Sequence, residues 1–227
     1  MNFERLTEKF MSKEICWRLG TKIGQKFMAL PYVDARAIQN RLDEVVGPFR
    51  WKDSYEVHTN GIICTLSIWC DQALVNGSAW VDKANGSPET NIEAFKGGIS
   101  KAFIRAAVNW GIGRYLYDLK DLYAQEVDSN YPGARYHWVK KEGREIFWVP
   151  PSLPLSAISD REKLMKELGS KLRSLTDGCK NKELYAHYLA KLELSSGSDI
   201  LNKDDEWLEE ALLYLGELSD ENNKQEA

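Results

Sequence analysis

Several residue patterns that mark catalysis or metal binding are missing from this sequence. Its cysteines form no CxxC pair, and its three histidines show no HxxxH or HExxH spacing. Four cysteines are too few and too scattered for a disulfide framework, and zinc sites need such spacings, so we expect neither here. Cys64 and Cys70 lie an even number of residues apart in an alternating stretch, which is typical of buried structural cysteines. The four cysteines are Cys16, Cys64, Cys70 and Cys179.

Long apolar runs and a secretory leader are missing as well. No run approaches the roughly 20 apolar residues that a membrane helix needs. The first nine residues mix both signs of charge and lack the apolar core of a signal peptide. We therefore expect an intracellular protein with no membrane partner.

Two glycine-containing segments resemble phosphate-binding loops, but their glycine spacing does not fit the known motifs. Residues 20–26 (GTKIGQK) resemble a phosphate loop, but the second glycine comes one residue too early and no Ser or Thr follows a Gly-Lys pair. Gly111-Ile112-Gly113 lacks the third glycine of a dinucleotide fingerprint and falls near the end of an expected helix. We expect no nucleotide or other cofactor.

Carboxylates that converge on a metal ion would be needed by a nuclease. The candidates are Asp118 with Asp121, and the run Asp204-Asp205-Glu206. They fall at expected helix ends or on solvated faces. The sequence therefore indicates a binding protein without catalytic or metal-ligating residues, and a nuclease is the alternative from the enzyme class.

The charge of the chain is unevenly distributed. The 227 residues are 43% hydrophobic and 28% charged, as in a globular protein, with a net charge of −4. Residues 1–145 carry 20 Lys and Arg against 18 Asp and Glu, a balance of +2, whereas residues 146–227 carry 10 against 16, a balance of −6. A mildly basic body is compatible with nucleic-acid binding because the local field matters more than the total.

A proline-rich piece at residues 149–154 separates two regions. Three prolines within five residues fit neither a helix nor a central strand. We expect a core over residues 1–149 and a helical acidic region over residues 150–227. Apolar stripes at helical spacing predict three helices in the second region, which pack into a small core or, alternatively, dock a partner. Their residues are Leu164, Leu168 and Leu172; Leu184, Tyr188 and Leu192; and Trp207, Leu208, Ala211, Leu215 and Leu218.

The clearest strand signal lies in the middle of the first region. Residues 62–70 alternate strictly, and the turn dipeptides Asn60-Gly61 and Asn76-Gly77 lie on either side of them. This pattern predicts an antiparallel meander of three strands over residues 51–58, 62–70 and 78–83.

Weaker signals come before and after the meander. Asp34 is a plausible N-cap for a helix that runs through Val46 and ends at Gly47-Pro48. The remaining expected elements are a short helix marked by Phe3, Leu6 and Phe10, strands over 15–19 and 22–32, and a hairpin of 136–139 with 145–149.

A long helix is expected from about Pro88 to Tyr117. Ser87 would be its N-cap, and Thr90 with Glu93 adds a capping-box pattern. Its apolar stripe consists of Ile92, Phe95, Ile99, Ala102, Ala106 and Trp110.

A glycine pair interrupts this helix. Gly97-Gly98 costs about 1 kcal/mol per glycine relative to alanine, which suggests that the sheet or a neighbouring subunit packs closely there. The elements together predict an α+β fold, with an antiparallel meander packed on a long helix and a small C-terminal helical appendage.

Cations line one face of the expected helix. Lys101, Arg105 and Asn109 lie at i, i+4 and i+8, with Lys96 before them and Arg114 after them. Cations about one turn apart, roughly 5–6 Å, can each meet a phosphate of a single strand, and arginine adds a planar donor fork. A merely solvated face is the alternative that these residues alone leave open.

Aromatic residues could add base stacking where their rings are exposed. The candidates are Tyr32, Tyr55, Trp69, Trp80, Tyr115 and Tyr117.

Residues 96–119, KGGISKAFIRAAVNWGIGRYLYDL, resemble the Rad-fifty-two family of single-strand annealing proteins. The phage Sak-type and bacterial DNA-damage-response branches are the most similar. The segments WRLG (17–20), YVDAR (32–36) and VGPFRW (46–51) precede the helix in the order typical of the family. The resemblance covers residues 3–120, about half of the chain.

The resemblance implies a β-β-β-α core that assembles into large rings, with single-stranded DNA in an outer basic groove, its backbone inward and its bases outward. By position, Arg105 matches the key groove arginine and Lys96 a groove lysine. Lys26, in the strand before Tyr32, matches a further basic groove residue. Tyr32 and Arg36, from the YVDAR segment, complete the candidates that the resemblance suggests.

One residue departs from the family pattern. Ile104 stands where eukaryotic members have a second basic residue beside the arginine. The groove is then weaker here, or Lys101 and Arg114 supply its charge instead. The region after Asp121 matches no part of the family pattern.

The function expected from the residues and the resemblance is ATP-independent binding and annealing of single-stranded DNA in recombination and repair. The expected partners are single-stranded DNA, further copies of the chain, and a single-strand-binding protein or other recombination factor at the C-terminal region. The expected compartment is the cytoplasm or nucleoid of a bacterial host. A scaffold that protects DNA ends or docks replication proteins, without annealing, is the alternative from another class.

Overall fold

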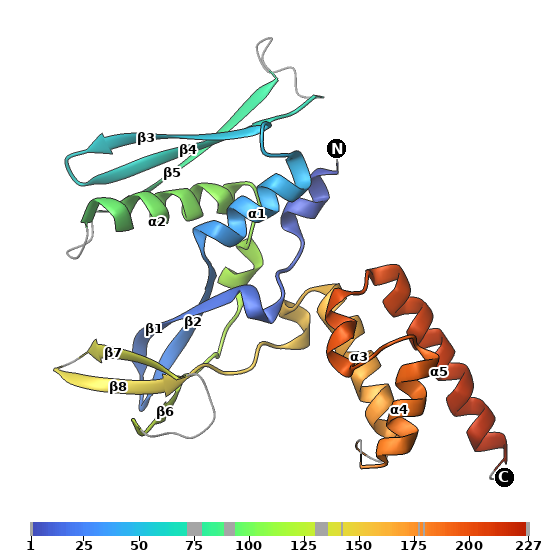
Figure 1. Cartoon of the computed structure of the whole chain (residues 1–227). Coiled ribbons are helices and arrows are strands. Elements are labelled where there is room, and N and C mark those ends of the chain that lie inside the picture. The colour runs from blue at the N-terminus through green and yellow to red at the C-terminus, as the bar shows by residue number, and fades with distance from the viewer. Residues whose placement is uncertain are drawn as a thin grey trace. The chain divides into compact units, whose positions relative to one another are not determined.

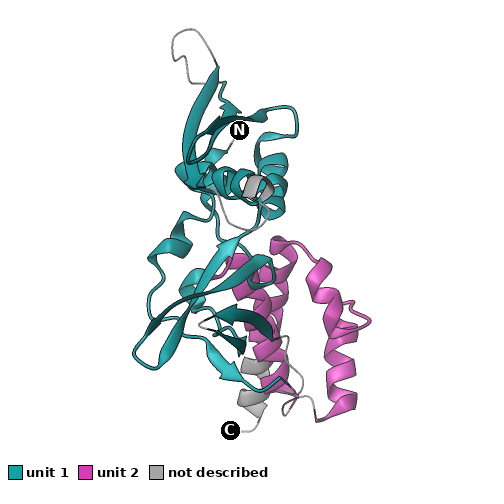
Figure 2. Cartoon of the chain, turned by 90° about the vertical axis from the view of Figure 1, so that its left-hand side faces the viewer, with its two compact units in different colours: residues 1–157 teal, residues 158–227 magenta. Residues whose placement is uncertain are grey.

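A computed structural model describes residues 2–71, 79–88, 94–129, 136–141, 143–176, 178 and 180–225, except for the side chains of 94–96 and 219–225. The chain divides into two compact units, residues 1–157 and 158–227 (Figure 2). The division falls eight residues after the boundary expected at the prolines. The fold is α+β with antiparallel sheets, as expected.

The central meander of the first unit consists of β3 (Trp51–His58), β4 (Gly61–Trp69) and β5 (Trp80–Pro88), in the order β3-β4-β5. Alternation along β4 buries Ile62, Cys64, Leu66 and Ile68 completely or almost completely. The predicted meander is confirmed, although β5 is longer than the strand expected over 78–83.

The long helix α2 (Ala94–Asn109) packs on one face of this meander (Figure 1). Its buried residues are Ala102, Phe103, Ala106 and Ala107. A Cβ on Gly98 would lie 2.9 Å from Cδ1 of Ile62, so this glycine permits close approach to the sheet. The close packing expected at the glycine pair is confirmed here, and the sheet is the partner.

The expected bounds of this helix were wrong at both ends. Ser87 and Pro88 belong to β5, where they pair with Ile62 and Gly61. Proline is tolerated there because β5 is an edge strand and Pro88 is its last residue. The proposed Thr90 and Glu93 caps lie outside the described residues.

The helix ends at Asn109 because glycines follow it. Gly111 has φ 94° and Gly113 has φ 67°, conformations that favour glycine. The short 3-10 helix η3 (Arg114–Asp118) comes next.

Helix α1 (Ala35–Val46) begins and ends as predicted. The Asp34 carboxylate accepts a hydrogen bond from the backbone N–H of Ala37 at 2.8 Å. Gly47 follows with φ 89°. The N-terminal helix expected near Phe3 is only a 3-10 helix, η1 (Phe3–Thr7), and a second one, η2 (Ser12–Glu14), comes before the first strand.

A hairpin of β1 (Ile15–Ile23) and β2 (Lys26–Val33) packs against a second sheet of β6 (Gln125–Val127), β8 (Arg144–Val149) and β7 (His137–Lys141), in the order β6-β8-β7. The hairpin of β7 and β8 was predicted, whereas β6 was not. A small core between the two layers contains Phe27, Ala29, Ala124, Ile146 and Trp148. The 3-10 helix η4 (Leu155–Ala157) ends the first unit.

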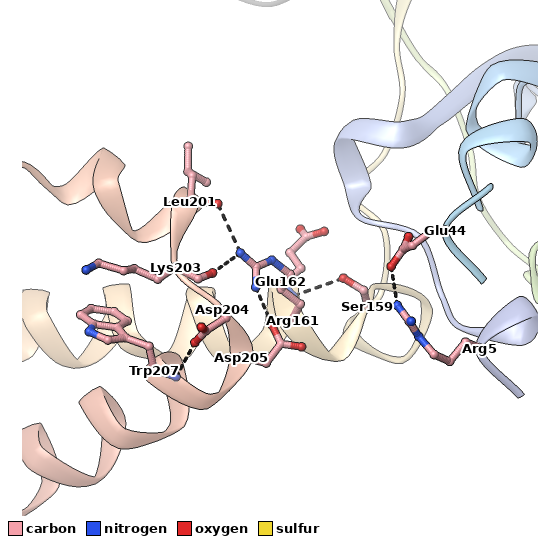
Figure 3. Close-up of polar contacts among 10 residues, drawn as sticks. All are labelled: Arg5, Glu44, Ser159, Arg161, Glu162, Leu201, Lys203, Asp204, Asp205 and Trp207. Atoms are coloured by element: carbon pink, nitrogen blue, oxygen red, sulfur yellow. Dashed lines mark hydrogen bonds and ion pairs between the residues drawn. The ribbon is translucent and has the colours of Figure 1, made fainter. Parts of the chain in front are cut away.

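The second unit contains α3 (Asp160–Leu175), α4 (Lys182–Lys191), the 3-10 helix η5 (Gly197–Asn202) and α5 (Asp205–Gln225). The predicted stripes form its core, which includes Leu168, Leu172, Leu208 and Leu215. Arg161 of α3 binds the Asp205 carboxylate at the start of α5 at 2.5 Å (Figure 3). It also donates to the backbone carbonyls of Leu201, in η5, and Lys203, directly after η5.

Across the described parts of both units, no helix combines the length and the apolar character that crossing a membrane requires.

Candidate nucleic-acid interface

Helix α2 lies beside the edge strand β5 (Figure 1). Polar side chains of both elements form hydrogen bonds along their common border. The register pairs Lys83 with Leu66 and Asn85 with Cys64. Directly paired residues point to the same side of a sheet. Lys83 and Asn85 therefore share the side of the meander on which α2 packs.

Arg105 occupies the exposed side of α2 and contacts Asn85 through two hydrogen bonds. Nε of Arg105 donates to the side-chain oxygen of Asn85 at 3.4 Å, and the amide nitrogen of Asn85 donates to the carbonyl of Arg105 at 3.2 Å. One side chain of β5 thus holds both the backbone and the guanidinium of this arginine.

The C-terminal end of α2 is capped by two cations. The carbonyl of Asn109 accepts hydrogen bonds from Nζ of Lys83 at 3.0 Å and from a terminal nitrogen of Arg114 at 2.8 Å, and Nε of Arg114 donates to the carbonyl of Val108 at 2.9 Å. Cations at this end complement the partial negative charge of the helix terminus. Nζ of Lys83 also lies 4.4 Å from the ring centroid of Trp110, within cation–π distance.

Asn109 itself joins the helix to the edge strand, since its amide nitrogen donates to the carbonyl of Ala84 at 2.9 Å. The row of cations beside this border, Lys83, Lys101, Arg105 and Arg114, is called the α2 strip below.

The α2 strip differs from other cations of the first unit in its lack of carboxylate partners. Arg50 pairs with Asp71 at 2.7 Å, and Arg144 pairs with Glu126 at 3.0 Å. Among the described residues, no carboxylate lies within ion-pairing distance of any member of the α2 strip. Its positive charge is therefore available to an anionic ligand.

The other candidate residues from the sequence lie on β2 and α1. Lys26 is exposed at the start of β2, with Nζ 5.9 Å from the ring centroid of Tyr123. Arg36 is exposed in the first turn of α1. The side chain of Lys96 lies outside the described residues.

Tyr32 is half-buried beside Cys16, its partner in the β1–β2 register. Burial raises the pKa of Tyr32, and Cys16 and Asp34 raise it further. Tyr32 is thus a neutral hydrogen-bonding group near neutral pH, and it is half-buried on the β1–β2 hairpin.

The end of β2 comes close to the turn that leads into η3. A Cβ on Gly113 would lie 2.9 Å from Cγ2 of Val33. Arg114 follows Gly113 directly, and Tyr32 precedes Val33. The structure thus places Lys101 and Arg105 along α2 and Arg114 at the C-terminal end of that helix. The backbone beside Tyr32 approaches this row, whereas Lys26 lies at the opposite end of β2.

Sequence reasoning missed Lys83 and Asn85. The expected third strand stopped at Lys83, so its side-chain alternation was not followed further. Continuing the alternation from Val81 through Lys83 to Asn85 would have placed all three on the helix-facing side.

A metal centre has no support in the described part of the chain, where no three His, Cys, Asp or Glu side chains are grouped as metal ligands.

Residues 3–135, which contain the α2 strip, match the sequence model of the Rad52/22 family of double-strand break repair proteins. The chain belongs to this family. The match confirms the resemblance read from residues 96–119. It includes every element from η1 to β6 but neither β7 nor β8.

Two bacterial proteins are similar in sequence to part of this chain. The single-stranded DNA-binding protein DdrA of Deinococcus radiodurans is 34% identical over 128 residues, which cover 56% of this chain and 59% of that protein. The protein of the same name from Deinococcus deserti is 32% identical over 162 residues, 70% of this chain and 71% of that protein. The chain thus spans less than two thirds of the first relative. No solved structure matches it significantly.

Proposed function

We propose that this chain binds single-stranded DNA without sequence preference and anneals complementary strands in recombinational repair, without ATP, as an oligomeric ring. The α2 strip is the observation that carries the binding part. Its cations come from α2, from the edge strand β5 and from the first residue of η3, and no described carboxylate neutralises them.

Phosphates are the ligands that such a row fits. Two of its members, Lys101 and Arg105, lie one helical turn apart and are exposed. Because Asn85 holds Nε of Arg105, the two terminal nitrogens of the guanidinium can form the fork that binds phosphate oxygens. The names of the two DdrA relatives, which describe single-stranded DNA-binding proteins, support the same ligand.

Annealing requires no cofactor in this proposal. Neutralisation of phosphates lowers the repulsion between two strands, and a backbone held by cations leaves base edges free to pair. Ring assembly, which the family resemblance implies, would hold many nucleotides in register.

Arg105→Ala tests the binding site. Loss of a charged hydrogen-bonding group to phosphate should weaken binding of a labelled oligonucleotide about 10- to 100-fold, measured by fluorescence anisotropy. Arg5→Ala is the matched control, because it removes the same charge from an arginine that is already paired with Glu44. Equal affinities of Arg105→Ala and the wild type, with unchanged circular dichroism, would contradict the assignment.

Two further measurements separate annealing from its alternative. The rate at which complementary strands pair should rise when the protein is added, whereas a scaffold that only protects DNA ends would slow pairing. Light scattering should show an assembly well beyond a dimer, and a monomer at micromolar concentration with DNA present would remove the ring from the proposal.

A further inference from the structure

The outward face of the sheet β6-β8-β7 presents aromatic rings to solvent. Trp138 is 62% exposed and Tyr136 is 40% exposed. Trp138 pairs with Phe147 in the β7–β8 register, and the rings of Tyr136 and Phe147 meet edge to face, 5.6 Å apart and at 73°. These three residues are called the aromatic face below.

Among the described residues, the aromatic face is part of no hydrophobic core. Alternation along β7 and β8 turns Val139, Ile146 and Trp148 inward, where they pack on Phe27 and Ala29 of the hairpin. The sheet therefore already has one buried side. Adjacent exposed aromatic rings on the other side are unusual for a protein surface and indicate a binding site.

One lysine lies at the end of the aromatic face. Lys140 is exposed and two residues beyond Trp138, so it points to the same side of β7. Its register partner, the exposed Glu145, points to that side as well. Nζ of Lys141 points the other way and donates to the carbonyl of Gly20, which brings the tip of the β7–β8 hairpin to the β1–β2 hairpin.

The junction of the two hairpins gathers further positive charge. Nζ of Lys141 and Nζ of Lys22 lie 5.3 and 5.5 Å from the ring centroid of Phe27. Lys26 follows the turn between β1 and β2, two residues before Met28, which bridges to Tyr123. In the part of the chain that the structure describes, none of Lys22, Lys26, Lys140 and Lys141 has a carboxylate within ion-pairing distance.

Exposed aromatic rings beside unpaired lysines are the combination that binds single-stranded nucleic acid. Bases stack on the rings whatever their sequence, and lysines attract the phosphates. The charge beside the aromatic face therefore favours a polyanion that also carries flat rings.

We propose that bases of single-stranded DNA stack on Trp138 and Tyr136, while neighbouring phosphates contact Lys140 and the lysines of the two hairpin tips. This surface is separate from the α2 strip, and β7 and β8 lie beyond the residues that match the family model. The inference rests on the proposed function, because it gives the same ligand a second contact.

An oligonucleotide without bases tests the stacking directly. A strand of abasic sites keeps the phosphates but removes the flat rings, so the wild-type protein should bind it about five- to 100-fold more weakly than a normal strand of equal length. In Trp138→Ala that preference should largely disappear, and in Trp138→Phe, which keeps a ring, most of it should remain. Fluorescence anisotropy measures all of these affinities.

Phe49→Ala is the control for the loss of an exposed aromatic ring, because Phe49 is 94% exposed in the turn between α1 and β3, away from this sheet. It should retain the wild-type preference. Circular dichroism of each variant checks the fold, and the abasic comparison on the wild-type protein needs no variant.

The possible failures are distinguishable. If the wild type binds no single-stranded DNA, the proposed function fails and this inference fails with it. If the wild type binds normal and abasic strands equally, or if Trp138→Ala keeps the preference, the aromatic face does not contact bases although the α2 strip still can. If Trp138→Ala instead reduces the size of the assembly in light scattering and keeps the base preference, the aromatic face joins protein copies and the inference is wrong.

Discussion

Asn85 binds Arg105 at two points, accepting from Nε at 3.4 Å and donating to the backbone carbonyl at 3.2 Å. The two residues are 20 positions apart in the sequence and come from a strand and a helix. The direction of the guanidinium therefore depends on the edge strand as well as on the rotamer of Arg105. An uncharged residue can thus affect how well a charged residue binds its ligand.

Asn85→Ala should weaken binding of single-stranded DNA about two- to tenfold, although no charge is lost. The substitution removes both hydrogen bonds to Arg105, each worth about 0.5–1.5 kcal/mol, and lets the guanidinium leave its bound orientation. Anisotropy titrations measure the effect. Ser54→Ala, an exposed position on the opposite edge strand β3, is the control and should bind normally. Equal affinities for Asn85→Ala and the wild type would show that Arg105 needs no positioning.

The dependence of binding on salt should identify which residues contact phosphate. For single strands, the slope of log K against log salt concentration changes by about 0.7 for each phosphate contact. Lys101→Ala and Arg105→Ala should each make the slope shallower by about this amount, whereas Asn85→Ala should weaken binding at an unchanged slope. Titrations at four or more salt concentrations give these values. An unchanged slope for both cation variants would mean that their charges face only solvent.

Gly113→Ala should destabilise the first unit by about 2–4 kcal/mol. The residue has φ 67°, which alanine adopts at a cost of about 1 kcal/mol, and the added Cβ would lie 2.9 Å from Cγ2 of Val33, which overpacks the site by a further 1–3 kcal/mol. Gly24→Ala is the matched control, since φ is 59° there and nothing lies within 4 Å. Gly24→Ala should lose only the cost of placing alanine at a positive φ, about 1 kcal/mol. Urea unfolding measures both, and similar losses for the two variants would refute the close contact between the end of β2 and the turn before η3.

Alkaline pH should destabilise the protein partly through Cys64. Burial, together with the nearby Asp53 carboxylate, raises the pKa of this thiol from a usual value of 9.0 to about 11, although a hydrogen bond with Tyr55 lowers it. Because the folded state holds the proton more tightly, its contribution is complete below pH 9 and is lost as pH rises through about 11.

Cys64→Val tests this contribution, because valine is similar in size and does not titrate. Relative to the variant, the wild type should lose about 2–3 kcal/mol of unfolding free energy over the full transition. Urea unfolding at pH 8 and pH 10.5 compares the two proteins before and during the transition. A constant difference between them at both pH values would mean that the thiol keeps an ordinary pKa.

Much of the fold could be predicted from local patterns. The alternation from Ile62 to Cys70 defines β4, because only one side of that strand faces the helix. The Asp34 cap and Gly47 define α1, since both satisfy local backbone requirements. The helix start predicted at Ser87-Pro88 was wrong because distant pairing, not local pattern, decides the structure there. A local cap signal was overridden by the ladder that pairs these residues with β4, and pairing between distant residues is not visible in a local window.

For the candidate site, too, some residues could be predicted from local patterns and others could not. Helical spacing alone placed Lys101 and Arg105 on one exposed face of α2. The contribution of Asn85 depends on where β5 lies beside α2, which no spacing within either element reveals. The exposure of Trp138 likewise follows from the packing of the β7–β8 hairpin on Phe27 and Ala29, which decides which side of β7 is covered. Composition therefore could not single out this ring among eight tryptophans.

The bond from Lys141 to the carbonyl of Gly20 has a consequence for how this chain can be divided. It joins a hairpin beyond the family match to one within it, and Ile146 and Trp148 cover Phe27 and Ala29. The match to the family model therefore ends before the residues that complete this layer of the fold. A fragment that ends at residue 135 would keep the recognisable family sequence but leave one layer of its own interior facing water.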